Sequence, residues 1–352
     1  MKIGLCTGGG DCPGLNAAIR AVVKHAIGTY GHQIIGIQDS FNGLMSRPYV
    51  ARELKITDVC EILSRGGTIL GTVNYGNPFV SENEKSQLVL DAYKALGLDA
   101  MIVVGGDGTQ DISANFSQKG LNIVGIPKTI DNDLAATELS IGFNTSVETC
   151  TDAISKLQST AESHDRIMVL ELMGRDAGHI ALHAGIAGGA DMILLPEIPF
   201  NYDPLVKKVE SLLKRGQHYS IVVVAEGAFE KGSKPNFKTV STSKYATQHL
   251  GGIGAMVAEK LHELTKVETR ITVLGHVQRG GSPNAFDRIL ASQMGVFAVD
   301  LVHQRKFGVV AGINDGRLSI TPYKDILGKT RPLSLDSSYI RTAEGLGICL
   351  GR

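Results

Sequence analysis

Short apolar segments alternate along this chain with longer amphipathic ones, and this alternation constrains the fold more than any other feature. The candidate buried strands are residues 3–6, 33–37, 100–104, 122–126, 167–172, 192–195, 220–225 and 270–274. Amphipathic stretches such as 16–27, 84–96, 146–160 and 204–215 lie between them. Strand and helix repeated in this order predict an α/β protein whose parallel sheets are covered by helices on both faces. Ligands of such sheets bind beyond the carboxyl ends of the strands.

Charge and cysteine content narrow the classes of partner. Lys plus Arg and Asp plus Glu both number 35, so the chain lacks the positive field that draws proteins to nucleic acid or anionic membranes. We therefore expect no nucleic-acid partner and no membrane partner. The sequence contains no run of about 18 apolar residues, so we expect no transmembrane helix. The apolar run at the start is too short for a signal peptide. Five cysteines without a CxxC pair favour reduced thiols in the cytoplasm.

Glycine-rich sequence directly follows several candidate strands. Residues 7–16 read Thr-Gly-Gly-Gly-Asp-Cys-Pro-Gly-Leu-Asn and join a strand to a helix. Glycines let backbone N–H groups approach an oxyanion, and a helix N-terminus favours negative charge there. The structural alternative is a tight turn whose glycines serve packing. A second cluster, Gly105-Gly106-Asp107-Gly108-Thr109, can hold Mg²⁺ through its carboxylate and phosphate through its amides, or can be a structural turn.

A third motif, Pro127-Lys128-Thr129-Ile130-Asp131-Asn132-Asp133, concentrates charge after another strand. Two carboxylates lie two residues apart beside a hydroxyl and a cation, which suits a general base acting on a substrate hydroxyl. The alternative is an Asx turn that caps a helix.

A fourth, basic set is scattered over Arg166, Met173-Gly174-Arg175, Arg270 and the segment 275–283. Arginine forks match phosphate oxygens bidentately. Each arginine alone would more often form a surface ion pair, and only the placement at glycine-flanked strand ends favours a phosphate site. A glycine cradle, a metal carboxylate, a base and an arginine set together predict phosphoryl transfer to a phosphorylated acceptor.

From residue 2 to about residue 310 the sequence resembles the 6-phosphofructokinase family, close to its mixed-substrate lineage. Six motifs stand in family order: Gly9-Gly10-Asp11, Gly105-Gly106-Asp107-Gly108, Thr129-Ile130-Asp131-Asn132-Asp133, Met173-Gly174-Arg175, Ala225-Glu226-Gly227 and Gly275-His276-Val277-Gln278-Arg279-Gly280-Gly281-Ser282-Pro283. The resemblance implies two Rossmann-like domains, each a mainly parallel sheet flanked by helices, with the active site in the cleft between them. We expect residues 1–140 plus about 255–305 in the donor and magnesium domain, 141–254 plus about 306–325 in the fructose 6-phosphate domain, and 326–352 as a C-terminal extension packing on the body.

The resemblance also implies roles for individual residues. Asp131 would deprotonate the sugar 1-hydroxyl, with Lys128, Thr129 and Arg175 completing the catalytic set. The residues that would hold the acceptor are Thr129, Asp131, Asp133, Arg166, Met173, Gly174, Arg175, Glu226, Arg270, His276 and Arg279. The residues that would bind the phosphoryl donor are Gly10, Asn74, Tyr75, Gly106, Asp107, Gly108 and Thr109. Among these, Asp107 would bind Mg²⁺, and Asp133 would also serve the magnesium side of the site. Arg166 and Arg270 match positions that reach a neighbouring subunit's substrate, which implies a homodimer or homotetramer with shared active sites.

Two positions bear on the phosphoryl donor. Gly108 is typical of family members that use ATP, because an Asp there would crowd and repel the α-phosphate of a nucleotide. Lys128 is typical of members that use pyrophosphate. A side chain such as Asp at position 108 would exclude a nucleotide by its bulk, whereas the cation of Lys128 does not exclude ATP. We therefore expect ATP as the donor, with pyrophosphate as the alternative. Asn74 stands where many family members have an Arg that bridges the donor and acceptor phosphates. Near the expected nucleoside pocket, Phe41 keeps an aromatic face for stacking, and Ile112 narrows the pocket.

Two other readings remain open. A sensor of sugar phosphates or nucleotides without activity could use the same scaffold, but it would be expected to lose Asp107, Asp131 or Asp133, and all three are present. The acceptor could instead be another sugar phosphate such as sedoheptulose 7-phosphate, because the same phosphate clamp would hold either sugar.

Overall fold

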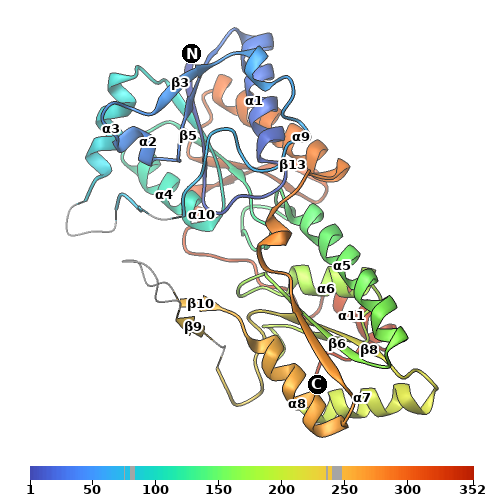
Figure 1. Ribbon diagram of the computed structural model, residues 1–352. Coiled ribbons are helices and arrows are strands. Elements are labelled where there is room, and N and C mark those ends of the chain that lie inside the picture. The colour runs from blue at the N-terminus through green and yellow to red at the C-terminus, as the bar shows by residue number, and fades with distance from the viewer. Residues whose placement is uncertain (75, 80–83, 235–236, 240–247) are drawn as a thin grey trace. The chain divides into compact units, whose positions relative to one another are not determined.

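The computed structural model describes residues 1–74, 76–79, 84–234, 237–239 and 248–352. The chain divides into two compact units (Figure 1). Unit 1 contains Met1–Thr145 and Arg279–Thr330, and unit 2 contains Ser146–Gln278 and Arg331–Arg352. Each unit is built on its own mainly parallel sheet with helices against it, as the alternation of apolar and amphipathic segments predicts. No helix within the described ranges is long and apolar enough to cross a membrane.

Unit 1 contains a seven-stranded sheet in the order β13-β12-β5-β4-β1-β2-β3. Its strands are β1 (Lys2–Gly8), β2 (Gln33–Ile37), β3 (Ala51–Leu54), β4 (Ala100–Gly105), β5 (Ile123–Pro127), β12 (Val309–Asn314) and β13 (Arg317–Pro322). The edge strands β3 and β13 run antiparallel to their neighbours and the other pairs are parallel. Every residue of β4 and β5 is buried, because helices cover both faces of a parallel sheet.

The helices of unit 1 pack on this sheet. They are α1 (Leu15–Tyr30), α2 (Asn42–Met45), α3 (Ser86–Ala95), α4 (Asp107–Gln118), α9 (Ala285–His303) and α10 (Tyr323–Ile326), with the short 3₁₀ helix η1 (Ile56–Val59). Helices α1 and α9 lie side by side (Figure 1). Helix α1 ends where Gly31 adopts a left-handed conformation, with φ of 64°.

Unit 2 contains a four-stranded parallel sheet in the order β11-β6-β8-β7. Its strands are β6 (Ile167–Leu172), β7 (Met192–Leu194), β8 (Ser220–Ala225) and β11 (Thr269–Val273), and an antiparallel pair is formed by β9 (Phe237–Thr239) and β10 (Gln248–Leu250). Its helices are α6 (His179–Ala187), α7 (Tyr202–Lys214), α8 (Ile253–Thr265), α11 (Ser338–Gly345) and most of α5 (Phe143–Ser163). The 3₁₀ helix η2 (Gly275–Arg279) follows β11.

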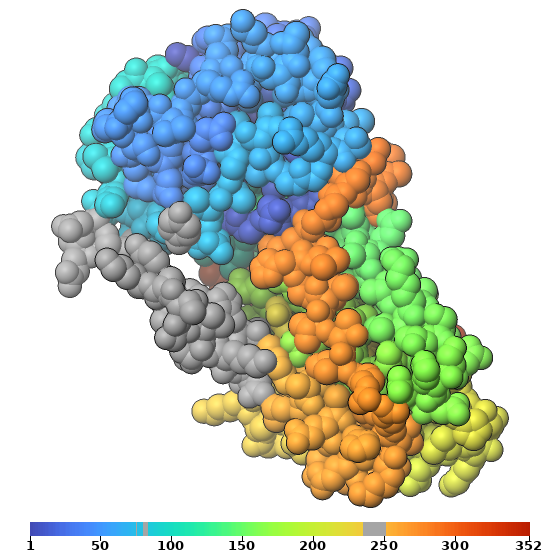
Figure 2. Space-filling view, viewed as in Figure 1, coloured from blue at the N-terminus to red at the C-terminus, as the bar shows by residue number. Residues whose placement is uncertain are grey.

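Strand β11 is the exposed edge of the unit 2 sheet. Arg270, Ile271 and Val273 are exposed, and the orange segment that contains them lies at the surface of unit 2 (Figure 2). An exposed edge with apolar side chains is a surface that proteins usually cover.

Each predicted strand corresponds to an observed strand, and Gln33–Ile37, Ile167–Leu172 and Ser220–Ala225 have the predicted limits. The sequence did not predict β12, β13 or α9. Helix α9 packs against α1, β5 and β12, and a helix buried on several sides lacks a clear amphipathic stripe.

The division of the chain differs from the expected one. Helix α8 and strand β11, expected in the first domain within 255–305, belong to unit 2, because β11 pairs with β6. Strands β12 and β13, expected in the second domain within 306–325, belong to unit 1, because β12 pairs with β5. The expected extension 326–352 is also split, since 331–352 packs on unit 2 while 326–330 stays with unit 1. Strand pairing connects residues far apart in sequence, which local patterns do not reveal.

Candidate active site

Three loops of unit 1 meet at one edge of its sheet. Strands β1, β4 and β5 are adjacent and parallel, and Gly8 pairs with Gly105, which in turn pairs with Pro127. The loops after these strands contain the first three sequence motifs. The sheet therefore brings the glycine-rich loop, the Asp107 turn and the Asp131 loop to the edge where parallel sheets bind ligands.

The loop after β1 is held by the segment that leads to Asn74. The Gly9 N–H donates to the Val73 carbonyl oxygen at 2.9 Å. The Thr72 hydroxyl donates to the Gly9 carbonyl oxygen at 2.6 Å. Gly9 itself has φ of +78°, a conformation that favours glycine. Asn74 is thus near the glycine-rich loop, as expected for a residue that binds the phosphoryl donor. Tyr75 lies outside the described residues.

Two cations contact the carbonyl groups of this loop. Lys128 is 2% exposed, and its ammonium group donates to the Gly10 carbonyl oxygen. Arg279 Nη1 donates to the Asp11 carbonyl oxygen at 3.4 Å, and a Cβ at Gly10 would lie only 2.0 Å from the same nitrogen. Gly10 is therefore required for the close approach of the guanidinium. Arg279, expected on the acceptor, lies against the donor-side loop in unit 1.

The charge state of Lys128 depends on this environment. Burial lowers the pKa of the Lys128 ammonium and the Arg279 guanidinium lowers it further, whereas the nearby Asp11 and Asp131 carboxylates oppose the shift. Lys128 and Arg279 place two basic side chains at the glycine-rich loop, and positive charge there favours an anion.

Asp131 is 5% exposed, and residues of its own loop hold its carboxyl group. The Thr129 hydroxyl donates to Asp131 Oδ2 at 3.3 Å and accepts from the Asp131 N–H at 3.1 Å. Asn132 has φ of 54°, and its side-chain amide donates to Glu138 O at 3.1 Å and accepts from Ser140 N at 3.0 Å. The loop thus presents a buried carboxylate beside a hydroxyl in a braced conformation. Asp133 is half-buried on the same loop.

Asp107 is the first residue of α4, between Gly106 and Gly108. Thr109 packs beneath the strand ends, since a Cβ at Gly105 would lie 2.4 Å from its Cβ. Among the described residues, no three His, Cys, Asp or Glu side chains gather to hold a metal. A single carboxylate nevertheless fits Mg²⁺, which usually takes one or two protein carboxylates and completes its shell with phosphates and water.

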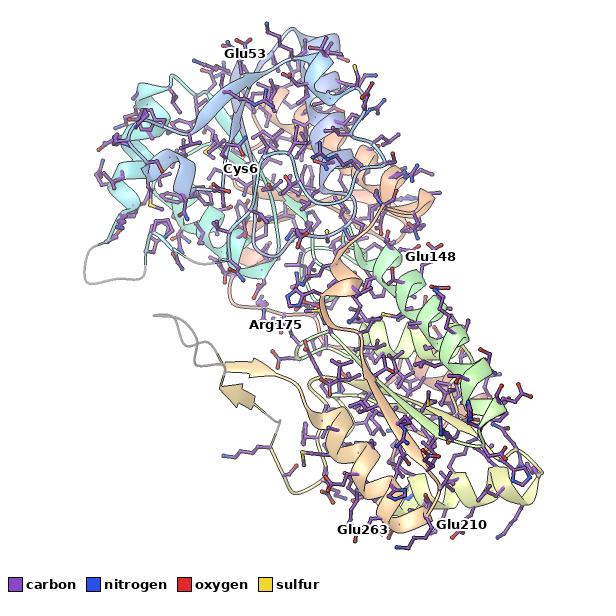
Figure 3. All side chains as sticks on the ribbon, viewed as in Figure 1. Cys6, Glu53, Glu148, Arg175, Glu210 and Glu263 are labelled. Atoms are coloured by element: carbon purple, nitrogen blue, oxygen red, sulfur yellow. The ribbon has the colours of Figure 1, made fainter. Side chains whose placement is uncertain are left out.

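In unit 2, another set of predicted residues meets at the carboxyl edge of its own sheet. Met173, Gly174 and Arg175 follow β6, Glu226 follows β8, and His276 follows β11. The Arg175 N–H donates to Glu226 Oε1 at 3.0 Å. Figure 3 shows Arg175 at the end of unit 2 opposite to Glu210 and Glu263.

The loop after β6 contains two consecutive residues with positive φ angles. Gly174 has φ of 144° and Arg175 has φ of 52°. A Cβ at Gly174 would lie 2.6 Å from the Ala177 carbonyl oxygen, and a Cβ at Gly227 would lie 2.2 Å from the Arg175 carbonyl oxygen. Both glycines are therefore required for the path of this loop.

Arg166 and Arg270 lie at the other end of the same strands. Arg166 directly precedes β6, and Arg270 pairs with Met168 near its start. Both arginines bind Glu268, with Arg166 Nε at 2.9 Å from Glu268 Oε2. Met173 follows Arg166 by seven positions along an extended strand, a distance of about 23 Å. One chain therefore does not bring these arginines to its own Met173 loop.

Several buried polar residues that brace these loops were not predicted to have a role. Gln110 donates to Gly105 O at 3.0 Å and Ile126 O at 3.1 Å, which ties the ends of β4 and β5 together. Asn16 donates to Arg65 O and Gly66 O, both at 3.1 Å, and accepts from Ile69 N at 2.9 Å. A polar residue in a helix-forming stretch normally predicts an exposed face, so the sequence carried no signal for these positions.

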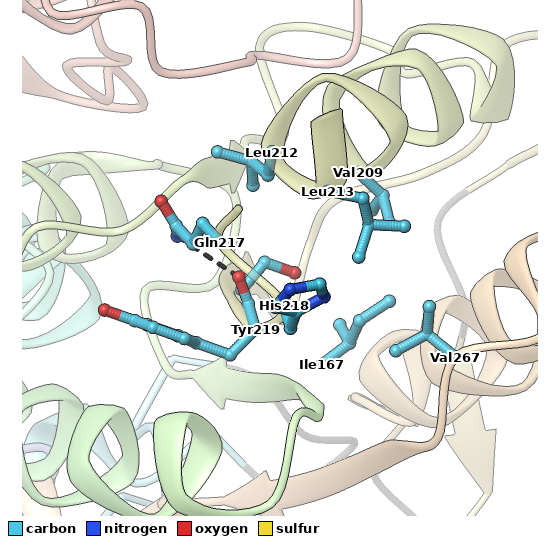
Figure 4. A pocket seen from close by; sticks show the side chains of 9 residues that line it. Ile167, Val209, Leu212, Leu213, Gln217, His218, Tyr219 and Val267 are labelled. Carbon is cyan, nitrogen blue, oxygen red and sulfur yellow. Dashed lines mark hydrogen bonds between the residues drawn. The ribbon is translucent and has the colours of Figure 1, made fainter. Parts of the chain in front are cut away.

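Two further features fall outside the candidate site. Phe41, expected to offer a stacking face, is 3% exposed and packs against Phe116 in the core, so this expectation is wrong. An apolar gap in unit 2 between Ile167, Leu212 and Tyr219 leaves no space for a water molecule (Figure 4). Its position near the start of β6 separates it from the Met173 loop.

Comparison with known proteins defines the family. The phosphofructokinase family model matches residues 2–302. The chain belongs to the phosphofructokinase family. It is 47% identical to ATP-dependent 6-phosphofructokinase 1 of Synechocystis sp., covering 99% of this chain and 98% of the relative. It is 43% identical to ATP-dependent 6-phosphofructokinase 2 of Clostridium perfringens, covering 99% and 97%.

Solved structures of the family agree with the fold. Phosphofructokinase from Pichia pastoris in the T-state superposes with a TM-score of 0.82 at 32% identity, covering 99% of this chain and 37% of that chain. The pyrophosphate-dependent phosphofructokinase from Nitrosospira multiformis also reaches a TM-score of 0.82, but at 19% identity it supports the fold alone. The predicted family and the α/β fold class are therefore confirmed.

Proposed function

We propose that this chain transfers a phosphoryl group from ATP to the 1-hydroxyl of fructose 6-phosphate. The observation that carries the proposal is the buried Asp131 carboxylate beside the Thr129 hydroxyl, on the strand-end edge that also carries the two glycine-rich loops. A base, a phosphate cradle and compensating cations are the parts that phosphoryl transfer needs. The names of the two curated relatives support this activity.

The geometry of unit 1 supports the roles that we propose for its residues. Asp131 accepts the proton of the sugar hydroxyl as it attacks the γ-phosphorus, and Thr129 orients the carboxylate by donating to Oδ2. Lys128 lies beside the Gly10 carbonyl group and Arg279 beside the Asp11 carbonyl group, where they offset the charge of the donor phosphates. Gly10, Gly106, Gly108 and Thr109 line the donor loops. Asp107 would hold Mg²⁺, which neutralises phosphate charge when bound.

The acceptor residues in unit 2 bind the sugar phosphate. Arg175 and His276 are exposed and supply cationic or donor groups, while Met173 and Gly174 shape the loop. The Glu226 carboxylate accepts a hydrogen bond from the Arg175 backbone N–H and so anchors Arg175. It also accepts hydrogen bonds from the sugar hydroxyls. Asp133, on the Asp131 loop of unit 1, is assigned to the acceptor by the resemblance to the family.

Open space at Gly108 favours ATP over pyrophosphate. A Cβ at Gly108 would meet no atom within 4 Å, so packing does not require glycine there. A side chain at 108 would instead fill space that a nucleotide donor needs. Lys128 remains the feature that favours pyrophosphate, which keeps that donor as the second candidate.

The arginines at the far end of β6 support a homo-oligomer. Arg166 and Arg270 are separated from the Met173 loop of their own chain by the length of a strand, and they lie at an exposed edge that carries Ile271 and Val273. We propose that they reach the substrate phosphate of a second copy. Mixing Asp131→Asn chains with Arg166→Ala chains should then restore activity, because one site in each pair regains both groups; no restoration in mixed oligomers would contradict the sharing.

The experiment that tests the function is a coupled assay with both donors and a panel of acceptors. ATP with fructose 6-phosphate should give the highest kcat/KM, together with fructose 1,6-bisphosphate as product. Comparable or better turnover with pyrophosphate would overturn the choice of donor. Preference for sedoheptulose 7-phosphate would change the acceptor, and binding without turnover would favour a sensor.

We also propose that the protein works in the cytoplasm. Burial raises the pKa of the Cys6, Cys12 and Cys150 thiols to about 12, so they stay protonated and behave as core residues. Reduced, unreactive thiols suit a cytoplasmic protein.

A further inference from the structure

Gln278 is a fully buried amide in the segment that follows β11. Its side chain is 0% exposed, and it is the last residue of unit 2 before the chain continues into unit 1. A buried amide needs partners for both its oxygen and its nitrogen, because an unsatisfied polar group in a core is costly. The proposed function gives this residue no role.

The side chain of Gln278 joins three separate segments of unit 2. Its Oε1 accepts from the Met173 N–H at 3.2 Å and from the Cys150 thiol at 3.2 Å. Its Nε2 donates to the Gly275 carbonyl oxygen at 3.0 Å. These bonds connect the start of the β6 loop to α5 and to the turn that carries His276.

The bond to Met173 acts at the point where the loop leaves its strand. The next two residues, Gly174 and Arg175, have φ of 144° and 52°, so the path of the loop depends on how it starts. On the other side, Glu226 holds the Arg175 N–H at 3.0 Å. Gln278 and Glu226 therefore fix the two ends of the same three-residue loop.

We propose that Gln278 is a positioning residue that sets the acceptor loop 173–175 and the His276 turn in one relative geometry. The inference rests on the proposed function, in which these segments bind the sugar phosphate. It assigns Gln278 no contact with the substrate. Its loss should weaken acceptor binding much more than donor binding, since its hydrogen bonds hold the acceptor segments, and Arg279 is the donor-side residue that follows it.

The test compares Gln278→Met, which has a similar shape and no hydrogen bonds, with the parent chain. The expected result is a rise of about tenfold in KM for fructose 6-phosphate, from loss of one bond to a buried N–H, with KM for ATP within about twofold. Gln217→Met is the matched control, because Gln217 donates to Tyr219 O at 3.1 Å elsewhere in unit 2. An unchanged KM for fructose 6-phosphate, or an equal rise for both substrates, in a folded variant would overturn the proposal.

Gln278→Glu provides a readout that a purely structural role would not change. At acidic pH the neutral acid can still donate to Gly275 O and accept from Met173 N, so KM should approach that of the parent. As pH rises the carboxylate loses the donor and faces the Gly275 carbonyl oxygen, so KM for fructose 6-phosphate should rise more steeply than in the parent. Parallel pH profiles would contradict the role of Gln278.

Hydrogen–deuterium exchange separates this inference from the proposed function. The Met173 N–H should exchange at least about tenfold faster in Gln278→Met than in the parent, whatever substrate the enzyme uses. If the parent chain fails to phosphorylate fructose 6-phosphate, the proposed function falls, and exchange still decides whether Gln278 holds the loop. Unchanged exchange at Met173 would overturn the positioning role even in an active enzyme.

Discussion

The Lys128 ammonium donates a hydrogen bond to the carbonyl oxygen of Gly10. This contact ties the loop after β5, which carries Asp131, to the glycine-rich loop after β1. Because Arg279 approaches the same glycine, two basic side chains lie together at this strand-end edge of a chain whose formal net charge is zero. In the proposed function, these two side chains would offset the charge of the donor phosphates.

Asp131→Asn should abolish most of the activity. The variant keeps the shape of the side chain but cannot accept the sugar proton, so kcat should fall at least about 100-fold while both KM values change little. Steady-state kinetics on a sample with the parent's melting temperature measures this. Near-parent turnover in the folded variant would remove Asp131 from the mechanism.

Lys128→Gly tests whether the buried cation sets the choice of donor. Removing the ammonium should lower turnover with pyrophosphate more than turnover with ATP, because the small donor has fewer other contacts to offset its charge. Kinetics with both donors on parent and variant give the ratio. An unchanged ratio would mean that Lys128 serves the loop structure and not donor selection.

Gly174→Ala should impair acceptor binding through the backbone. With φ of 144° and the Ala177 carbonyl oxygen 2.6 Å from the new Cβ, the loop must shift. Strain of about 1–3 kcal/mol predicts a rise of about tenfold or more in KM for fructose 6-phosphate. Gly189→Ala is a suitable control, since its φ of +72° is also strained but no atom lies within 4 Å of its Cβ. Equal effects of the two variants would contradict the argument.

His179 should make the protein sensitive to acid. Burial lowers its pKa from 6.5 to about 4, so the unfolded chain binds a proton more readily between these values. The free energy of unfolding should therefore fall as pH drops from about 6.5 to about 4, by about 3 kcal/mol from this residue. His179→Gln keeps a donor for the Arg331 carbonyl oxygen without titrating, and urea unfolding should show a flatter pH profile. The pKa of His183 is also lowered by burial, so some slope should remain; an unchanged profile would be the contrary result.

Local sequence determined the strands, the α/β class and the motifs at the strand ends, because the period of apolar residues and the glycines after strands are local properties. It therefore predicted which loops carry Asp107, Asp131 and Arg175. Tertiary structure alone decided that β11 pairs with β6 and β12 with β5, that Arg279 lies against Gly10, and that Gln278 is buried beneath the Met173 loop. Strand pairing and burial depend on contacts between residues far apart in the chain, and no local pattern encodes which distant partner completes them.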